Sequence, residues 1–228
     1  MTKLAALDNP AWNSLISGHR PVAEINGMAG RFPVAMSPIV GLERYVAEAF
    51  AQLEALVPMD DAVGLVTTAS YEIPASWEQL GEIACFQMVC HAPPPRPDIV
   101  PMRLVDTDAT AMLELALATE PGPFRAGTIG MGRYYGLKAD DGRLMAMAGE
   151  RMQSDGLTEV SAVCTWPEFR GRGLAATLVS FVAAQIAAEG RVPFLHVKTE
   201  NAGAIALYRK LGFEVRATVV FRLIRRRA

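Results

Sequence analysis

Residues 159–179 read EVSAVCTWPEFRGRGLAATLV, and this stretch decides the fold. Its first part, Glu159–Cys164, is a short and mostly apolar run of the kind that forms a strand. A Trp-Pro turn leads into Arg170–Ala175, where two glycines stand one residue apart beside two arginines. From Leu174 to Glu189 the apolar residues recur with a helical period. The stretch therefore predicts a strand, a glycine-rich loop and a helix in succession.

The loop Arg170–Ala175 has the chemistry of an anion-binding site. Gly171 and Gly173 let backbone N–H groups approach an oxyanion closely, while the helix dipole and the neighbouring arginines add positive potential. The loop is not a Walker loop, because no Gly-Lys-Ser/Thr follows, and Thr177 stands where the dinucleotide fingerprint has its third glycine. By itself the pattern is equally compatible with a tight turn.

The segments around this loop predict an α/β sheet. A helix is expected before it, followed by a hairpin whose Asp-Asp-Gly turn supplies a residue that tolerates positive φ. Another strand, a short helix and a final long strand follow the loop and its helix. The expected elements are a helix over 106–118, hairpin strands over 133–139 and 143–153, a strand over 194–198, a helix over 202–211 and a strand over 213–223. This order of strands and helices indicates an α/β fold.

The first hundred residues are less informative. An apolar stripe predicts a helix over 41–57, ending before a proline, and buried strands are expected over 62–67 and 82–89. Four prolines within residues 92–98 form a semi-rigid spacer, which predicts a boundary there. Cys85, Cys90 and His91 lack a second ligand pair, so we expect buried thiols and no metal site.

Composition and charge exclude several classes of protein. The 228 residues are 51% apolar and 20% charged, which suits a globular chain with one large or two small domains. No apolar run is long enough to span a membrane, and the first residues lack the core of a secretory signal, so we expect a cytoplasmic protein and no membrane partner. Residues 1–100 carry 5 Lys/Arg against 11 Asp/Glu, whereas residues 101–228 carry 17 against 13. We therefore expect an anionic ligand in the second part and no nucleic-acid partner.

A second motif, NAGAIALYRKLGF at residues 201–213, follows the loop by 28 residues, counted from Gly173 to Asn201. With it, the chain resembles the GNAT superfamily of acyl-coenzyme A-dependent N-acetyltransferases. The stretch at 160–179 is similar to that family's strand, pyrophosphate loop and helix, in the Arg-Gly-x-Gly-x-Ala form. The second motif matches the family's Asn-x-x-Ala-x-x-Leu-Tyr-x-x-x-Gly-Phe pattern at every defined position. The resemblance covers roughly residues 101–224.

The resemblance implies a GNAT-type mixed, mostly antiparallel sheet flanked by helices. Residues 1–95 are similar to the degenerate GNAT-like extra half of two-part members such as glycine N-acyltransferase-like proteins. We therefore divide the chain into an N-terminal α/β half at 1–95 and a catalytic domain at 96–228. The N-terminal half is expected to shape the acceptor site or a subunit contact. A chain beginning near Arg96 is expected to bind coenzyme A if it folds.

The resemblance also implies acetyl-CoA as co-substrate, without a metal. The pantetheine arm would pair like a strand with Val163, Cys164 and Thr165, where neighbouring strands splay apart. A backbone N–H near Val163 would polarise the thioester carbonyl, and Tyr208 would protonate the departing thiolate. The pyrophosphate would bind the backbone N–H groups of Arg170, Gly171, Arg172, Gly173, Leu174 and Ala175.

Several side chains have an alternative role. Asn201 would contact the cofactor arm or cap the second helix, and Tyr208 on an amphipathic helix is otherwise ordinary core. Cys164 could carry an acyl group, but no His or Lys stands beside it in the sequence to lower its pKa. His196 is expected in the core or the groove. The alternative to an enzyme is a non-catalytic acyl-CoA sensor or regulatory protein. Such a protein would not need Tyr208, so the presence of this residue argues against it.

The proton acceptor for the amine is the least defined part of the site. Glu159 shares a strand face with Ser161 and Val163. A half-buried carboxylate there would have a raised pKa and accept the proton, directly or through water. The alternatives are a salt-bridged or substrate-positioning Glu159, with Glu150 as the next candidate base. The sequence leaves open whether the amine is a small molecule or a peptide, which acyl length is preferred and whether the chain forms a homodimer.

Overall fold

The computed structural model describes residues 3–227, and its centre is an eight-stranded sheet with the order β4-β11-β5-β10-β9-β8-β7-β6. Only β9 and β10 pair in parallel, and every other neighbouring pair is antiparallel. The predicted mixed, mostly antiparallel sheet is confirmed. The strands are β4 (Ala62–Thr67), β5 (Trp77–Val89), β6 (Met102–Leu104), β7 (Tyr134–Lys138), β8 (Leu144–Ser154), β9 (Leu157–Thr165), β10 (Val192–Lys198) and β11 (Glu214–Arg226).

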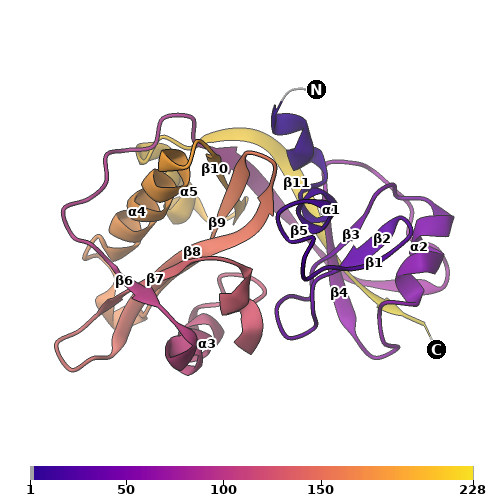
Figure 1. The fold of residues 1–228 in the computed structure, drawn as a ribbon, viewed down its shortest axis with the longest axis horizontal. Coiled ribbons are helices and arrows are strands. Elements are labelled where there is room, and N and C mark those ends of the chain that lie inside the picture. The colour runs from indigo at the N-terminus through magenta and orange to yellow at the C-terminus, as the bar shows by residue number, and fades with distance from the viewer. Residues whose placement is uncertain (1–2, 228) are drawn as a thin grey trace.

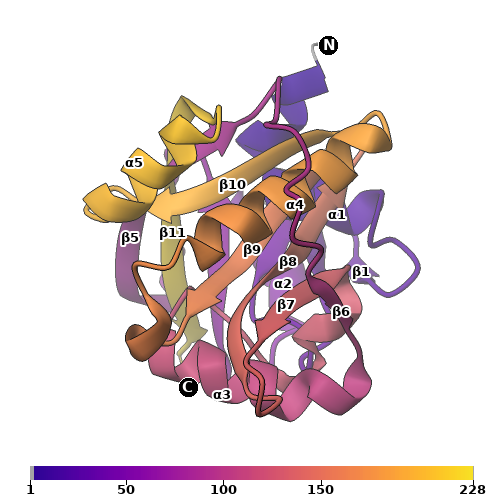
Figure 2. The ribbon, with the colours of Figure 1, turned by 90° about the vertical axis from the view of Figure 1, so that its left-hand side faces the viewer.

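Helices cover both faces of this sheet. Figure 2 shows α4 lying across β8 and β9, and the apolar side chains of α4 and α5 pack on the same face. On the other face, α3 packs over β8 and β9, and α1 covers the part nearer β5. The helices are α1 (Pro10–Ile16), α2 (Ala47–Glu54), α3 (Ala109–Thr119), α4 (Leu174–Ala188) and α5 (Ala202–Lys210).

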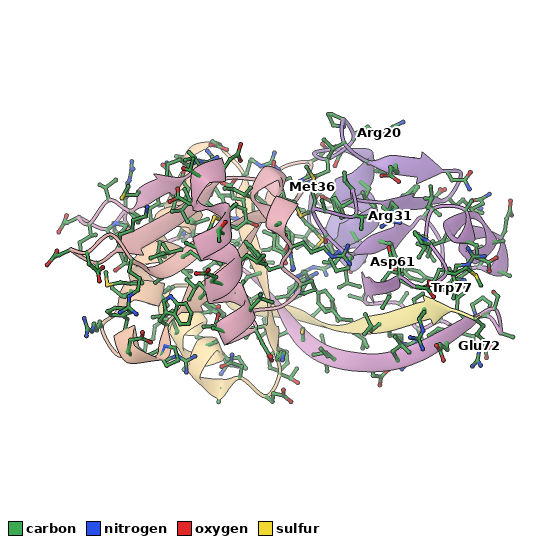
Figure 3. The ribbon with its side chains drawn as sticks, turned by 90° about the horizontal axis from the view of Figure 1, so that it is seen from below. Arg20, Arg31, Met36, Asp61, Glu72 and Trp77 are labelled. Carbon is green, nitrogen blue, oxygen red and sulfur yellow. The ribbon has the colours of Figure 1, made fainter. Side chains whose placement is uncertain are left out.

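The N-terminal part adds a small antiparallel sheet of β1 (Glu24–Asn26), β2 (Ala29–Arg31) and β3 (Val40–Leu42). Together with α2 and the outer end of β11 it encloses a separate apolar cluster around Phe50 and Trp77. Arg31 is buried there, with its guanidinium 3.6 Å from the carboxylate of Asp61 beside β4 (Figure 3).

The large sheet continues across the division at residues 95 and 96. β5, from the first part of the chain, lies between β10 and β11 of the second, and β4 pairs with the far side of β11. Figure 1 shows β5 and β11 running together from the centre of the molecule into its N-terminal part. The division therefore separates two sequence segments that share one sheet.

Most predicted elements lie where the sequence placed them, and the strand over 62–67 is confirmed residue for residue. The hairpin is confirmed as β7 and β8, with Gly142 at φ 85° in its turn. The helix predicted over 41–57 is wrong at its start, because α2 begins at Ala47 and Gly41 lies in β3. A Cβ on Gly41 would lie 2.6 Å from the backbone nitrogen of Trp12, so this glycine allows β3 to pack directly against α1.

Candidate active site

The strands β9 and β10 diverge next to the glycine-rich loop. Their parallel pairing joins Leu157–Glu159 to Val192–Phe194 and, within the described residues, goes no further. On its other side β9 carries a bulge, where the register with β8 shifts and Ala162 adopts a φ of 50°. A non-glycine residue in the left-handed region stores strain, and such residues concentrate at functional sites. The strand that leads to the loop is therefore open along the edge that faces β10.

A cleft of about 1130 Å³ runs from the loop through this opening to the far face of the sheet. It brings together almost all of the predicted site residues, although Arg172 is not among its lining residues. The predicted residues that line it are Glu159, Val163, Cys164, Thr165, Arg170, Gly171, Gly173, Leu174, Ala175, Asn201 and Tyr208. The sequence motifs therefore converge on one cavity.

The loop presents backbone N–H groups at one end of the cleft. Gly171 and Gly173 have φ values of 77° and 76°, a backbone conformation that residues other than glycine rarely adopt. The first helical bond of α4 runs from the Thr177 N–H to the Gly173 carbonyl, so the N–H groups of Leu174 and the next two residues have no acceptor within the helix. Arg172 lies over the Phe169 ring at 5.0 Å. This end of the cleft is suited to bind an anion.

Tyr208 projects from α5 into the same cleft and is only 7% exposed. Burial raises the pKa of its hydroxyl to about 12, and nearby Cys164 acts in the same direction, so the hydroxyl keeps its proton at neutral pH. No residue in the described part of the chain forms a hydrogen bond with this hydroxyl. A hydroxyl that faces a cavity and has no partner within the protein is available to donate to a ligand.

The thiol of Cys164 is buried in β9. Burial raises its pKa to about 12, an effect that a hydrogen bond with Thr119 only partly offsets. A thiol in that state is a poor nucleophile at neutral pH. This environment argues against a role for Cys164 as an acyl carrier. It is compatible with the other predicted role, in which Cys164 lines the cofactor arm.

Glu159 lies at the other side of the strand opening, 1% exposed. Its carboxylate accepts hydrogen bonds from Arg151 Nε at 2.8 Å and Nη2 at 2.7 Å, from His196 Nδ1 at 2.8 Å and from the Met152 N–H at 3.3 Å. Burial acts to raise the pKa of Glu159, but Arg151 and His196 together lower it to about 2. The expected raised pKa is wrong, because the carboxylate is fully buried against a guanidinium rather than half-buried in apolar surroundings.

His196 is oriented by two partners. Its Nδ1–H donates to Glu159, and its Nε2 accepts from the side-chain amide of Gln87 at 3.1 Å. Gln87 has no freedom to flip, because the same amide nitrogen donates to the Leu7 carbonyl and the amide oxygen accepts from Arg216 at 2.8 Å. Arg151 and Gln87 could not be recognised from the sequence, since nothing local marks a polar residue whose partner lies on another strand.

Two other predicted residues have defined partners. Glu150 is buried and held by Arg133, with Nε–Oε1 at 2.9 Å, and it does not line the cleft. Asn201 caps α5, because its side-chain oxygen accepts from the Ala204 N–H at 3.1 Å, and it also borders the cleft. The two roles weighed for Asn201 are therefore compatible.

The far end of the cleft is built largely from the N-terminal part of the chain. Its walls and floor come from β4, β5, β11 and the residue just before β3, and include Ile39, Gly64, Gly81, Ile83, Phe221 and Leu223. Cys85 borders this end as well, and all three cysteines are free and buried, as predicted. Within residues 3–227, no cluster of His, Cys, Asp or Glu is placed to hold a metal ion. None of the helices described is long and apolar enough to cross a membrane.

Comparison with known proteins identifies relatives of both the second part and the whole chain. The FR47-like protein family model matches residues 134–222. Mycothiol acetyltransferase from Mycolicibacterium gilvum is 32% identical over 90 residues, which span 37% of this chain and 30% of that protein. The chain therefore matches less than a third of the length of that curated relative.

Solved structures match over nearly the full length. A GNAT-family protein from Novosphingobium aromaticivorans is 40% identical, with a TM-score of 0.89 over 97% of this chain and 99% of that chain. A GCN5-related N-acetyltransferase from Kribbella flavida has a TM-score of 0.62 at 16% identity, over 94% of this chain and 95% of that chain. The first match is close enough to establish common ancestry along the whole chain, and the second shows a shared fold.

Proposed function

This chain belongs to the GNAT family of acetyltransferases, and we propose that it transfers an acetyl group from acetyl-CoA to a primary amine by direct attack in a ternary complex. The observation that carries the proposal is the protonated hydroxyl of Tyr208, which faces the cleft that also holds the glycine loop and has no partner among the described residues. The family accounts for the acetyl transfer, and the direct mechanism and the amine are our inference.

The residues at the loop and along β9 fit acetyl-CoA. The N–H groups of Arg170–Ala175 would hold the pyrophosphate, and the open edge of β9 at Val163–Thr165 would receive the pantetheine amides. Thr165 supports this placement, because its buried hydroxyl has no hydrogen-bond partner among the residues described. Bound acetyl-CoA supplies an activated thioester whose carbonyl carbon is the electrophile.

In the proposed reaction the amine nitrogen attacks the thioester carbonyl carbon, and the carbon–sulfur bond breaks. The N–H near Val163, freed from the regular ladder by the bulge at Ala162, would stabilise the oxyanion. Tyr208 would donate its proton to the leaving sulfur, and the amine would lose one proton as the amide forms. The proton that Tyr208 gives to the sulfur is replaced from solvent after the thiol leaves, and the amine releases one proton to solvent. The protons and charges of the reaction therefore balance.

Glu159 is proposed to position the site rather than to receive the amine's proton. Its oxygens already accept four hydrogen bonds, and its pKa of about 2 makes it a weak base. Its role would be to orient His196 and Arg151 at the floor of the acceptor end. The acceptor ammonium must first lose a proton to become nucleophilic, so turnover should rise with pH toward the pKa of that ammonium. The second proton would pass to water in the cleft as the amide forms.

The similarity of residues 1–95 to the extra half of glycine N-acyltransferase-like proteins stays a prediction. The contribution of Gly64, Gly81 and Ile83 to the far end of the cleft supports the related proposal that this part of the chain selects the acceptor.

The test compares wild type with Tyr208→Phe. Acetyl-CoA affinity is measured by isothermal titration, and transfer is followed as free thiol released with a panel of amino acids, polyamines, aminoglycosides, arylalkylamines and peptides. The variant should bind acetyl-CoA normally, while its single-turnover rate falls by roughly 10²–10⁴-fold, the usual contribution of general acid catalysis. An unchanged single-turnover rate would mean that Tyr208 is an ordinary core residue and not the general acid. Tight acetyl-CoA binding with no transfer to any class of amine would favour the sensor.

A further inference from the structure

Two glycines at the far end of the cleft are not required by the fold. Six glycines lie inside the described strands, and four of them would place a Cβ only 2.3–2.6 Å from another atom. Those four are Gly30, Gly41, Gly136 and Gly149. A Cβ on Gly64 or Gly81 would meet no atom within 4 Å, and neither residue has a positive φ. Glycine weakens a strand, and one that packing does not demand often marks the close approach of a ligand.

The register of the sheet places these glycines side by side. Leu223 of β11 pairs with Gly64 of β4 on one side and with Gly81 of β5 on the other. Residues directly opposite each other in antiparallel strands share a face. The side chain of Leu223 therefore lies between two positions that have no side chain. We call Gly64, Leu223 and Gly81 the glycine row.

The glycine row continues the face of the sheet that holds the reaction centre. The next row on that face, about 7 Å along the strands, contains Phe221 and Ile83, which pair with each other. The Phe221 ring lies 5.3 Å from the His196 ring, edge to face. One surface thus runs from His196 and its partner Glu159 to the glycine row, and all of it borders the same cleft.

This surface is apolar and lacks a partner. Ile83 is 46% exposed and Leu223 is 42% exposed, although both border a cleft rather than the outer surface alone. Nearer the glycine loop, the hydroxyl of Tyr208 faces the same cleft and has no partner among the described residues, so it is free to hydrogen-bond a ligand there. A ligand that spans both ends of the cleft needs a polar head near Tyr208 and an apolar tail on the floor.

We propose that the acceptor is an amine with an aryl or branched alkyl tail, and that the tail lies on Phe221, Ile83 and the glycine row. Gly64 and Gly81 are then specificity-determining residues, because any side chain there would occupy the space of the tail. The inference rests on the proposed amine transfer for the identity of the head group, and the apolar subsite is argued from the cleft itself.

Binding of two small amines tests the subsite without requiring the natural acceptor. The protein saturated with coenzyme A is titrated with 2-phenylethylamine and with ethanolamine, whose amines are alike and whose tails differ. Wild type should bind 2-phenylethylamine about tenfold or more tightly than ethanolamine, because only the former buries apolar area. Gly81→Val and Gly64→Val should each remove that preference, while Ala84→Val, on the opposite and exposed face of β5, should leave it unchanged.

The controls separate loss of the subsite from loss of the fold. Each variant should keep the wild-type affinity for acetyl-CoA and a Tm no lower than that of wild type, and Gly81→Ala serves where valine disturbs folding. Equal affinity of wild type for the two amines, or an undiminished preference in the glycine variants, overturns the proposal. If 2-phenylethylamine binds as expected but no thiol is released from acetyl-CoA, the subsite stands and the proposed transfer to amines fails.

Discussion

Replacing Glu159 by Gln tests whether this carboxylate is a structural anion rather than a base. The change keeps the size and shape of the side chain and removes the charge that Arg151 and His196 contact at 2.7–2.8 Å. The variant also leaves the buried Arg151 guanidinium without a counter-ion. Breaking a buried pair in this way costs about 3–5 kcal/mol in proteins generally.

The pKa of Glu159 yields the same magnitude. It lies at about 2 in the folded protein, whereas an unperturbed glutamate titrates at 4.5, and this difference corresponds to about 3 kcal/mol. Because the folded pKa is the lower one, this stability is fully present above pH 4.5 and is lost as the pH falls toward 2. At pH 3 linkage leaves less than half of it.

Urea unfolding of wild type and Glu159→Gln at pH 7 and pH 3 measures both quantities. The free energies of unfolding should differ by about 3 kcal/mol at pH 7 and by less than half of that at pH 3, because glutamine mimics the protonated acid. Glu78→Gln is the matched control, since Glu78 pairs with Arg225 at 2.6 Å on the surface and should cost no more than about 1 kcal/mol. A difference that does not change with pH, or one below 1 kcal/mol at pH 7, would refute the assignment.

Three further predictions concern the cofactor end and the sheet. Gly173→Glu should abolish acetyl-CoA binding in a calorimetric titration, because it forces a side chain onto a φ of 76° and sets a carboxylate against the pyrophosphate; retained affinity would remove the loop assignment. Cys164→Ala should keep turnover within about threefold of wild type, since the thiol's pKa of about 12 leaves almost no thiolate at neutral pH. Complete loss of transfer without loss of acetyl-CoA binding would instead support covalent catalysis by Cys164. A chain beginning at Arg96 lacks β4 and β5 and should show no cooperative unfolding transition by circular dichroism; a stable, acetyl-CoA-binding fragment would contradict this.

The backbone geometry at the proposed cofactor end could be predicted because its signals are local. The loop at Arg170–Ala175 and the motif at residues 201–213 each combine a helix start with residues of a defined backbone conformation. Gly171 and Gly173 adopt the positive φ that such a loop needs, and Asn201 caps α5. Strand and helix periodicity over residues 133–223 depended only on neighbouring residues, and the structure confirms those elements.

The environment of Glu159 could not be predicted in the same way. Its strand and face followed from periodicity, but its pKa depends on Arg151, which reaches it only because β8 carries an irregularity opposite Glu159. His196 and Gln87 come from two further strands. A bulge and a cross-strand partner leave no mark in a local sequence pattern, so the sequence left a base and a salt-bridged carboxylate both open, and the structure shows Glu159 in a buried ion pair with Arg151.

The position of β5 explains why the N-terminal part cannot be an independent accessory. The strand separates β10 from β11, so the sheet that carries His196 is incomplete without it. The same strand supplies Gln87, which orients His196, and Gly81, which leaves room on the cleft floor about 20 Å further along, at about 3.4 Å per residue. A substitution that shifts the register of β5 would therefore alter the floor of the acceptor end and the orientation of His196 together. Under the proposed function, selectivity for the acceptor and the geometry of the reaction centre would thus be coupled through β5, whereas the proposed pyrophosphate loop at the start of α4 lies outside this strand and should keep its affinity for acetyl-CoA.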